Sequence, residues 1–254
     1  MVSKIYRLFR ILGAGRNKHD KCKNEGNLKF RHMLVVTYGR SGSTLLQGIL
    51  NGIPGVCVLG ENGNVYFDYF MIWKKLSELR RKHKGALLPK NPWYRIDAVE
   101  DDQYFDYFKE FLTLFIPKAP GVRCIGFKEV RYINTGEYLE EYLDFLQKVF
   151  PDVALIINTR KLENVTKSGW WKEKDAAEST LALREFESRL LQYAASKANC
   201  FHIQYEEVVE NGQKLRGLFD FLGADYCAED VALILNTPHS YAPEQQHIKN
   251  LFKE

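Results

Sequence analysis

Apolar runs alternate along the chain with stretches of helical periodicity. Strand-like runs, each followed by polar or charged residues, occupy residues 33–38, 122–127, 153–158 and 200–205. Helical patterns are found at residues 104–115, 136–150, 176–198 and 213–222. Strands that alternate with helices predict a three-layer α/β fold, in which helices flank a central parallel sheet on both faces. In such a sheet, ligands bind at the carboxyl ends of the strands.

Two regions depart from this alternation. Residues 62–103 carry many aromatic side chains and a basic run from Lys74 to Lys84. They predict an inserted helical and loop lid, whose aromatic part, residues 66–73, closes over the site. Residues 1–31 predict an amino-terminal extension or linker, because glycine and polar residues dominate its second half. The folded unit is then a single domain over residues 32–254.

Composition limits the class of protein. With 254 residues, of which 45% are apolar, the chain can bury a full core, and this excludes a disordered protein. A net charge of +4 is too modest to indicate a general nucleic-acid binder. The basic amphipathic segment 4–12 can contact a membrane surface, although a packed or frayed terminal helix is the commoner structure for such a segment.

Cysteine usage and targeting signals bear on the compartment. The cysteines show no metal-ligand spacing, so free thiols and a reducing compartment are predicted, with a single disulfide as the alternative; they are Cys22, Cys57, Cys124, Cys200 and Cys227. The sequence shows no signal-peptide pattern and no membrane-spanning run. A glycosylation sequon at residues 164–166 lies in an expected ligand loop, where a glycan would block binding. We expect a cytoplasmic protein without a metal centre.

The segment Thr37–Thr44 joins an apolar strand, residues 33–36, to an amphipathic run, residues 45–50, and predicts a phosphate-binding turn. A strand that turns through glycines into a helix leaves the first N–H groups of the helix unpaired, where the helix dipole also favours an anion. The loop does not match a Walker A motif, since Thr37 stands at the first glycine position and Ser43 at the lysine position. ATP or GTP hydrolysis is therefore disfavoured, and an ordinary βα turn without a ligand is the plain alternative.

A second anion site is predicted after the third strand-like run. Arg160 ends that run, and Ser168 follows eight residues later in a helical stretch. We expect the guanidinium and the hydroxyl to converge on one phosphate, because the guanidinium supplies a fork of donors and the hydroxyl one more.

The two predicted anion sites together resemble the donor site of the sulfotransferases. Tyr38–Thr44 resembles the 5′-phosphosulfate loop of that family and Arg160 with Ser168 its 3′-phosphate motif, within a resemblance that spans residues 33–222. This implies a P-loop-type fold. It also implies that the sulfuryl donor is 3′-phosphoadenosine 5′-phosphosulfate (PAPS), that the product left after transfer is 3′-phosphoadenosine 5′-phosphate (PAP), and that no metal takes part. The residues that match the donor motifs are Gly39, Arg40, Ser41, Gly42, Ser43, Thr44, Arg160 and Ser168.

The resemblance also bears on the acceptor. The chain lacks the loop lysine and the later Arg-Lys-Gly segment that are typical of the cytosolic small-molecule branch. It is similar instead to the branch of tyrosylprotein and glycan sulfotransferases, where a Gly-Glu pair follows the loop, as Gly60 and Glu61 do here. This implies sulfuryl transfer to a hydroxyl of a carbohydrate or other cell-surface acceptor, with tyrosine O-sulfation as the nearest alternative. The expected partner is a hydroxyl-bearing glycan, lipid or tyrosine peptide, and not a nucleic acid.

Catalytic roles are expected for three charged residues. Glu61 is the candidate general base on the acceptor hydroxyl, because the resembling branch has its glutamate there, and Glu129 is the rival base. Lys128 follows the second strand-like run, where it and Arg40 can reach the sulfate and the leaving 5′-phosphate. The structural alternatives are a solvated Glu61 and a simple Lys128–Glu129 pair at a strand end. Lys249 is one candidate for a further contact to the 3′-phosphate.

Other features leave alternatives open. Trp170 and Trp171 can flank an adenine ring, although tryptophans on a helix more often belong to the core. A P-loop nucleotide kinase or NTPase is opposed by the missing lysine. A noncatalytic nucleic-acid-binding protein would use the basic face from Lys74 to Lys84, which can equally be a solvated helix.

Overall fold

Five parallel strands form the central sheet, in the order β2-β3-β1-β4-β5. The computed structural model describes residues 27–86, 88–98, 100–115 and 121–237. The strands are β1 (His32–Val36), β2 (Val56–Leu59), β3 (Cys124–Glu129), β4 (Val153–Thr159) and β5 (Cys200–Gln204). The prediction of an α/β fold with a central parallel sheet is confirmed.

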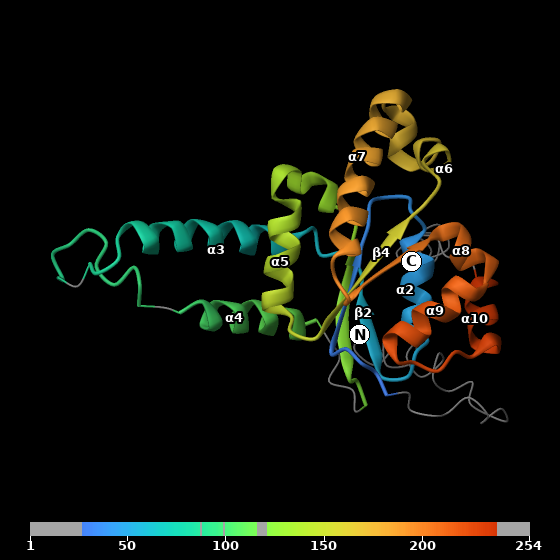
Figure 1. The fold of residues 1–254 in the computed structure, drawn as a ribbon, viewed down its shortest axis with the longest axis horizontal. Helices are drawn as coiled ribbons and strands as arrows, with labels where there is room; N and C mark the ends of the chain where they lie inside the picture. The colour runs from blue at the N-terminus through green and yellow to red at the C-terminus, as the bar shows by residue number, and fades with distance from the viewer. Residues whose placement is uncertain (1–26, 87, 99, 116–120, 238–254) are drawn as a thin grey trace, which may run out of the picture.

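Helices cover both faces of the sheet (Figure 1). Side chains of a strand alternate between the faces, so Met33 and Val35 join one buried cluster while Leu34 and Val36 join the other. The first face, called the α2 face, is covered by α2 (Ser43–Asn51), α8 (Tyr205–Glu210), α9 (Gln213–Leu222) and α10 (Ala228–Leu235). The second, called the α5 face, is covered by α3 (Val65–Lys82), α4 (Asp101–Thr113), α5 (Leu139–Val149) and α7 (Ala176–Ala195). These are the three layers that the sequence predicts.

The bounds of the elements differ from the prediction in a few places. α9 has the predicted bounds, and α7 ends at Ala195 instead of residue 198. α5 begins at Leu139, three residues after the predicted start of the helix 136–150. The first predicted residues belong to a 3₁₀ helix, η2 (Tyr132–Tyr138), inside which Gly136 has a non-helical φ of 56°. β2 is missing from the prediction, since four residues are too few to show a period.

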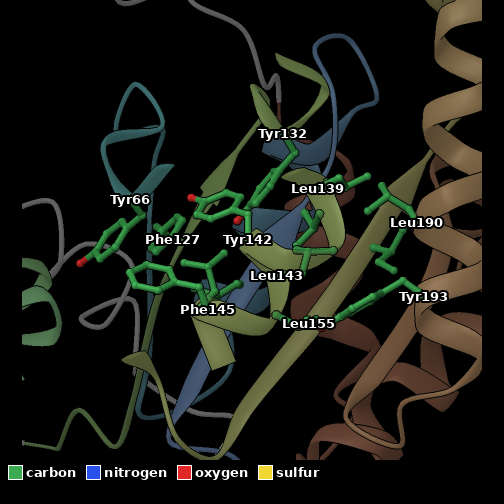
Figure 2. Packing of buried hydrophobic residues seen from close by; sticks show 14 of the residues in the cluster. Tyr66, Phe127, Tyr132, Leu139, Tyr142, Leu143, Phe145, Leu155, Leu190 and Tyr193 are labelled. Atoms are coloured by element: carbon green, nitrogen blue, oxygen red, sulfur yellow. The ribbon is translucent and has the colours of Figure 1, made fainter. Parts of the chain in front are cut away.

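α3 and α4 form an arm that projects from the body of the molecule (Figure 1). Its base is aromatic and belongs to the core, because Tyr66 and Phe70 are buried and the Tyr66 ring stacks on Phe127 of β3 with 5.0 Å between centroids (Figure 2). A spacing of four residues puts both side chains on one face of α3. Tyr66 and Phe70 therefore belong to the core and do not close over the site. A lid function for the rest of the insertion stays a prediction.

Four of the cysteines lie within the described residues, and all four are free thiols. Cys57 and Cys124 are buried, and burial raises the pKa of the Cys124 thiol to about 12. Cys200 and Cys227 are partly buried. The predictions for residues 4–12, Cys22 and Lys249 lie outside the described residues. Across the described ranges, no helix combines the length and the apolar character that a membrane crossing requires.

Candidate active site

A short loop, residues 37–42, connects the end of β1 to the start of α2. Gly42 precedes α2 with φ 80°, no side chain caps this helix, and its first turn contains no acidic residue. The first N–H groups of the helix are thus open to an anion, which the helix dipole also attracts. Buried Thr37 fixes the loop, because its hydroxyl lies 2.7 Å from Ser41 Oγ and 2.6 Å from the carbonyl oxygen of Asn158.

Two glycines allow aromatic rings to lie directly against the loop. A Cβ atom at Gly39 would lie 2.1 Å from the Trp170 ring, and one at Gly42 would lie 2.1 Å from the Tyr205 ring. The indole of Trp171 is buried and donates a hydrogen bond to the Gly39 carbonyl at 3.0 Å. Trp171 is therefore a structural support of the loop. Trp170 is half exposed, and of the two tryptophans it is the one open to contact with an adenine ring.

Arg40, Arg160 and Ser168 come together beside the loop. Arg40 Nε donates to Ser168 Oγ at 3.0 Å, and Arg160 Nη1 donates to the Arg40 carbonyl oxygen at 3.1 Å. The Arg160 guanidinium also lies over the Tyr205 ring, 4.3 Å from its centroid. Its Nε is buried and has no hydrogen-bond partner among the described residues. The structure thus unites residues of both predicted anion sites.

Ser168 reaches this group from a turn, and its predicted place on a helix is wrong. It lies between α6 (Leu162–Thr166) and the 3₁₀ helix η3 (Gly169–Glu173). Gly169 explains the turn, because its φ of 59° favours glycine and a Cβ there would lie 2.8 Å from Arg40 Cδ. The glycine lets the Arg40 side chain pass close to the backbone.

Tyr38 ties the loop to the end of β4 and to α7. Its hydroxyl oxygen accepts a hydrogen bond from the Arg160 N–H at 3.0 Å, and the hydroxyl also contacts the carboxylate of Glu187. Burial raises the pKa of Glu187, and the hydrogen bond from Tyr38 opposes this rise. Burial likewise raises the pKa of Tyr38. The sequence places Tyr38 in the motif without a role, and Glu187 carries no sequence signal because a single glutamate on a long helix is commonplace.

Glu61, Lys128 and Arg131 form an ionic group where β2 and β3 end. Lys128 Nζ donates to Glu61 Oε1 at 2.7 Å, and Arg131 Nη1 donates to Glu61 Oε2 at 3.2 Å. The Lys128 side chain is 5% exposed and that of Glu61 is 30% exposed. The parallel register explains the contact, because Phe127 pairs with Leu59, two residues before Glu61. Two predicted catalytic residues therefore touch, and Arg131 is a third member to which the sequence assigns no role.

Glu129 holds the backbone of the loop after β2. Its carboxylate is fully buried and accepts hydrogen bonds from the N–H groups of Asn62, Asn64, Val130 and Arg131. The Arg131 guanidinium adds an ion pair at 3.1 Å. This set of donors gives Glu129 a structural role, which a lone strand-end glutamate does not reveal in the sequence.

The predicted alternative of a Lys128–Glu129 pair is wrong. Successive residues of a strand point to opposite faces of the sheet. Lys128 pairs in register with Val35, which faces α2, and Glu129 pairs with Val36, which faces α5. The two side chains therefore do not pair with each other, and Arg131 links them because its Nη1 contacts both Glu61, the partner of Lys128, and Glu129.

The loop and the ionic group lie at one edge of the sheet. β1 leads into the loop and is flanked by β3, which carries Lys128, and by β4, which ends next to Arg160. The arrangement offers guanidinium, hydroxyl and backbone N–H donors beside a carboxylate–lysine pair. Within the part of the chain that the structure describes, no group of three or more His, Cys, Asp or Glu side chains is placed to hold a metal ion.

A comparison with protein-family models decides the class. The model described as the sulfotransferase family matches residues 33–228. This chain belongs to the sulfotransferase family. Membership confirms the predicted enzyme class, and the matched residues include the loop, Glu61, Lys128, Arg160 and Ser168. Membership in this family favours sulfuryl transfer over the two alternatives, an NTPase and a nucleic-acid-binding protein.

Solved structures include distant neighbours of this sulfotransferase. A sulfotransferase domain from the curacin biosynthetic pathway is 14% identical, with a TM-score of 0.48, over 82% of this chain and 78% of that chain. Retinol dehydratase, solved in a complex with retinol and PAP, is 14% identical, with a TM-score of 0.36, over 82% of this chain and 64% of that chain. A search of curated protein sequences found no match.

Proposed function

We propose that this sulfotransferase transfers a sulfuryl group from PAPS to a hydroxyl of a carbohydrate or other cell-surface acceptor. The observation that carries the proposal is the convergence of Arg40, Arg160 and Ser168 beside the uncapped start of α2. These groups offer donors to two separated anions, which suits a 3′,5′-bisphosphate. A nucleoside triphosphate would call for a lysine at the position of Ser43.

The residues of the loop and its neighbours fit this donor. Residues 39–44 would hold the 5′-phosphosulfate at the start of α2, and Arg160 with Ser168 would hold the 3′-phosphate. The unpartnered Nε of Arg160 supports this assignment, because a buried donor without an acceptor is costly unless a ligand supplies one. When bound, PAPS supplies the sulfuryl group, and the remaining work falls to side chains of the protein.

Glu61 is the proposed general base that takes the proton from the acceptor hydroxyl. Its carboxylate is partly exposed, so an acceptor can reach it. Glu129 is the poorer candidate, because it is fully buried and four N–H groups and a guanidinium already occupy its oxygens. Exposure therefore favours Glu61.

Lys128 and Arg40 are proposed to neutralise the negative charge that develops on the leaving 5′-phosphate. A lysine that is nearly buried acts strongly on such charge, because little water screens it. The Lys128 ammonium has three donors, of which one contacts Glu61 at 2.7 Å. The other two would face the sulfuryl group, so one side chain would connect the base with the transferred group.

Tyrosine O-sulfation remains the nearest variant of the proposal. Both acceptors present a hydroxyl to Glu61, and sulfate transfer to sugar or to tyrosine-peptide acceptors distinguishes them. The four free thiols support a reducing compartment, the cytoplasm, as the place of the reaction.

The experiment that tests this function is transfer of labelled sulfate from PAPS, with magnesium chelated, to sugar, lipid and tyrosine-peptide acceptors. We expect transfer to at least one sugar acceptor. Transfer to tyrosine peptides alone would show that the acceptor is a tyrosine and not a carbohydrate. Magnesium-dependent ATP turnover, without any transfer from PAPS, would overturn the proposal that the enzyme is a sulfotransferase.

A further inference from the structure

The far end of the arm exposes large apolar side chains. We define the arm tip as residues 83–98, which connect α3 to α4 and are described except for residue 87. Leu88, Trp93 and Tyr94 are 61%, 38% and 43% exposed. Figure 1 shows the arm tip well away from the sheet and from the loop at the start of α2. These side chains therefore lie outside the core and away from the candidate active site.

The arm tip is folded into turns that hold these side chains outward. The Tyr94 N–H donates to the Asn91 carbonyl at 3.0 Å, and the Trp93 N–H donates to Asn91 Oδ1 at 2.9 Å. The Trp93 ring stacks on His83 with 4.2 Å between centroids, and the Arg95 N–H reaches back to the Ala86 carbonyl. The apolar groups are thus displayed on an ordered surface.

Exposed cations surround this apolar patch. Residues 80–98 contain six lysines and arginines, of which Lys84, Lys90 and Arg95 belong to the arm tip, and one acidic residue, Asp97, which accepts a hydrogen bond from the Gly85 N–H. Among the described residues no carboxylate pairs with the exposed cations of the region, which are Arg81, Lys82, Lys84, Lys90 and Arg95. Two other cations of α3 do pair with carboxylates: Lys74 with Glu141 and Arg80 with Asp101.

We propose that the arm tip binds the surface of a membrane that contains anionic lipids. Trp93 and Tyr94 are amphipathic rings of the type that lies at the interface of a bilayer, and Leu88 would enter the apolar boundary beside them. The lysines and arginines would place their stems along this boundary and their charges on the lipid headgroups. The arm then holds the enzyme at the membrane by its tip, with the active site free.

A nucleic acid is the competing partner for a basic and aromatic surface. It would use the cations and the rings, but it offers no apolar medium for Leu88, which is 61% exposed, the most of the large apolar side chains among the described residues of the arm tip. The exposed aliphatic group among the cations therefore favours a lipid surface.

The test measures binding of the full chain to vesicles of phosphatidylcholine alone and of phosphatidylcholine mixed with phosphatidylserine. We expect binding to the mixed vesicles only, and a shift of tryptophan fluorescence to shorter wavelength that the Trp93→Phe variant loses. Lys84→Gln with Lys90→Gln is expected to lower the partition coefficient about thirtyfold. Leu88→Ser is expected to lower it about tenfold or less, because one aliphatic side chain is lost from the interface.

A matched control removes two positive charges from a helix outside the arm. Lys214→Gln with Arg216→Gln changes two exposed cations of α9, and we expect vesicle binding close to that of the wild type. No vesicle binding by the wild type, or equal losses in the control and the tip variants, would overturn the proposal. Loss of RNA binding in the tip variants, with no vesicle binding at all, would assign the surface to nucleic acid instead. The tip variants should keep sulfate transfer to a soluble acceptor, so the outcome is separate from that of the transfer assay.

Discussion

The candidate active site has two halves that are held together by different kinds of contact. In the donor half, made of the loop with Arg40, Arg160 and Ser168, backbone carbonyls, hydroxyls and rings fix the arginines. In the ionic half, made of Glu61, Lys128, Arg131 and Glu129, charged groups fix one another.

The difference shows how each half is prepared for a substrate. No carboxylate neutralises Arg40 or Arg160 among the described residues, so their charges are available to a ligand of opposite sign. In the ionic half, the charges of Lys128 and Arg131 balance those of Glu61 and Glu129, and the Glu61 carboxylate is the more exposed of the two. We therefore expect the donor half to control binding and the ionic half to control transfer and local stability.

Removal of the proposed base should have the largest effect on transfer and leave donor binding intact. Glu61→Gln keeps the size of the side chain but cannot take a proton, so transfer should fall by about 10²–10⁴-fold. The affinity for PAP, measured by calorimetry, should stay close to that of the wild type. Glu229→Gln, an exposed glutamate of α10, is the control and should keep full transfer. Nearly full transfer by Glu61→Gln would remove Glu61 from the role of base.

Glu129→Gln should act on stability. Its buried carboxylate accepts hydrogen bonds from four N–H groups, and glutamine offers only one acceptor oxygen, so buried donors lose their partners at a cost of about 1–3 kcal/mol. The free energy of unfolding in urea measures the loss. A variant with wild-type stability and no transfer would instead identify Glu129 as the base.

Loss of the buried lysine should slow transfer with a smaller effect on binding. Lys128→Ala removes the cation beside Glu61, and we expect kcat to fall by about 10²–10³-fold. Lys161→Ala, an exposed lysine, serves as the control. If the Lys128 variant loses PAP affinity to the same extent as kcat, the lysine belongs to the donor half.

Ser168→Ala should weaken donor binding alone. The change removes the hydroxyl that accepts the hydrogen bond from Arg40, and PAP affinity should fall about fivefold to tenfold with kcat nearly unchanged. Ser188→Ala, an exposed serine of α7, is the matched control. A large fall in kcat at saturating PAPS would contradict the assignment.

The smallest expected effect concerns pH. Burial lowers the pKa of His202, whose Nε2 lies 2.8 Å from Thr159 Oγ1, below its usual value of 6.5. Below about pH 6.5 the unfolded chain takes up a proton that the folded chain resists, so stability falls as the pH decreases toward the folded-state pKa. His202→Gln should make this decline shallower in urea unfolding at several pH values. If the free energy of unfolding of the variant and that of the wild type decrease in parallel with pH, His202 contributes nothing to the pH dependence of stability.

The sequence predicts the donor half better than the ionic half, for a physical reason. The loop and the strand before it are contiguous, and glycines with hydroxyl residues at a helix start indicate an anion site without tertiary information. The pairing of Glu61 with Lys128 depends on the register of β2 and β3, and β2 is too short to be recognised. Glu129 could be interpreted only after the alternation of faces along β3 was known.

The arm shows the same limit. Aromatic side chains at residues 66–73 look available for a lid, yet two of them face the core. The Tyr66 ring stacks on Phe127 (Figure 2), and the Phe70 ring contacts Tyr142 and Phe145 of α5. Periodicity indicates that a face exists, and tertiary packing decides whether it meets the core or a ligand.

The most direct test of the two-phosphate donor half is a calorimetric comparison of PAP with AMP, which lacks the 3′-phosphate, in the wild type and in Arg160→Ala. Charge-assisted hydrogen bonds to the 3′-phosphate should make wild-type binding of PAP about 10–100-fold tighter than that of AMP. The variant should bind the two nucleotides with nearly equal affinity. Equal affinities in the wild type, or a difference that survives in Arg160→Ala, would contradict the account.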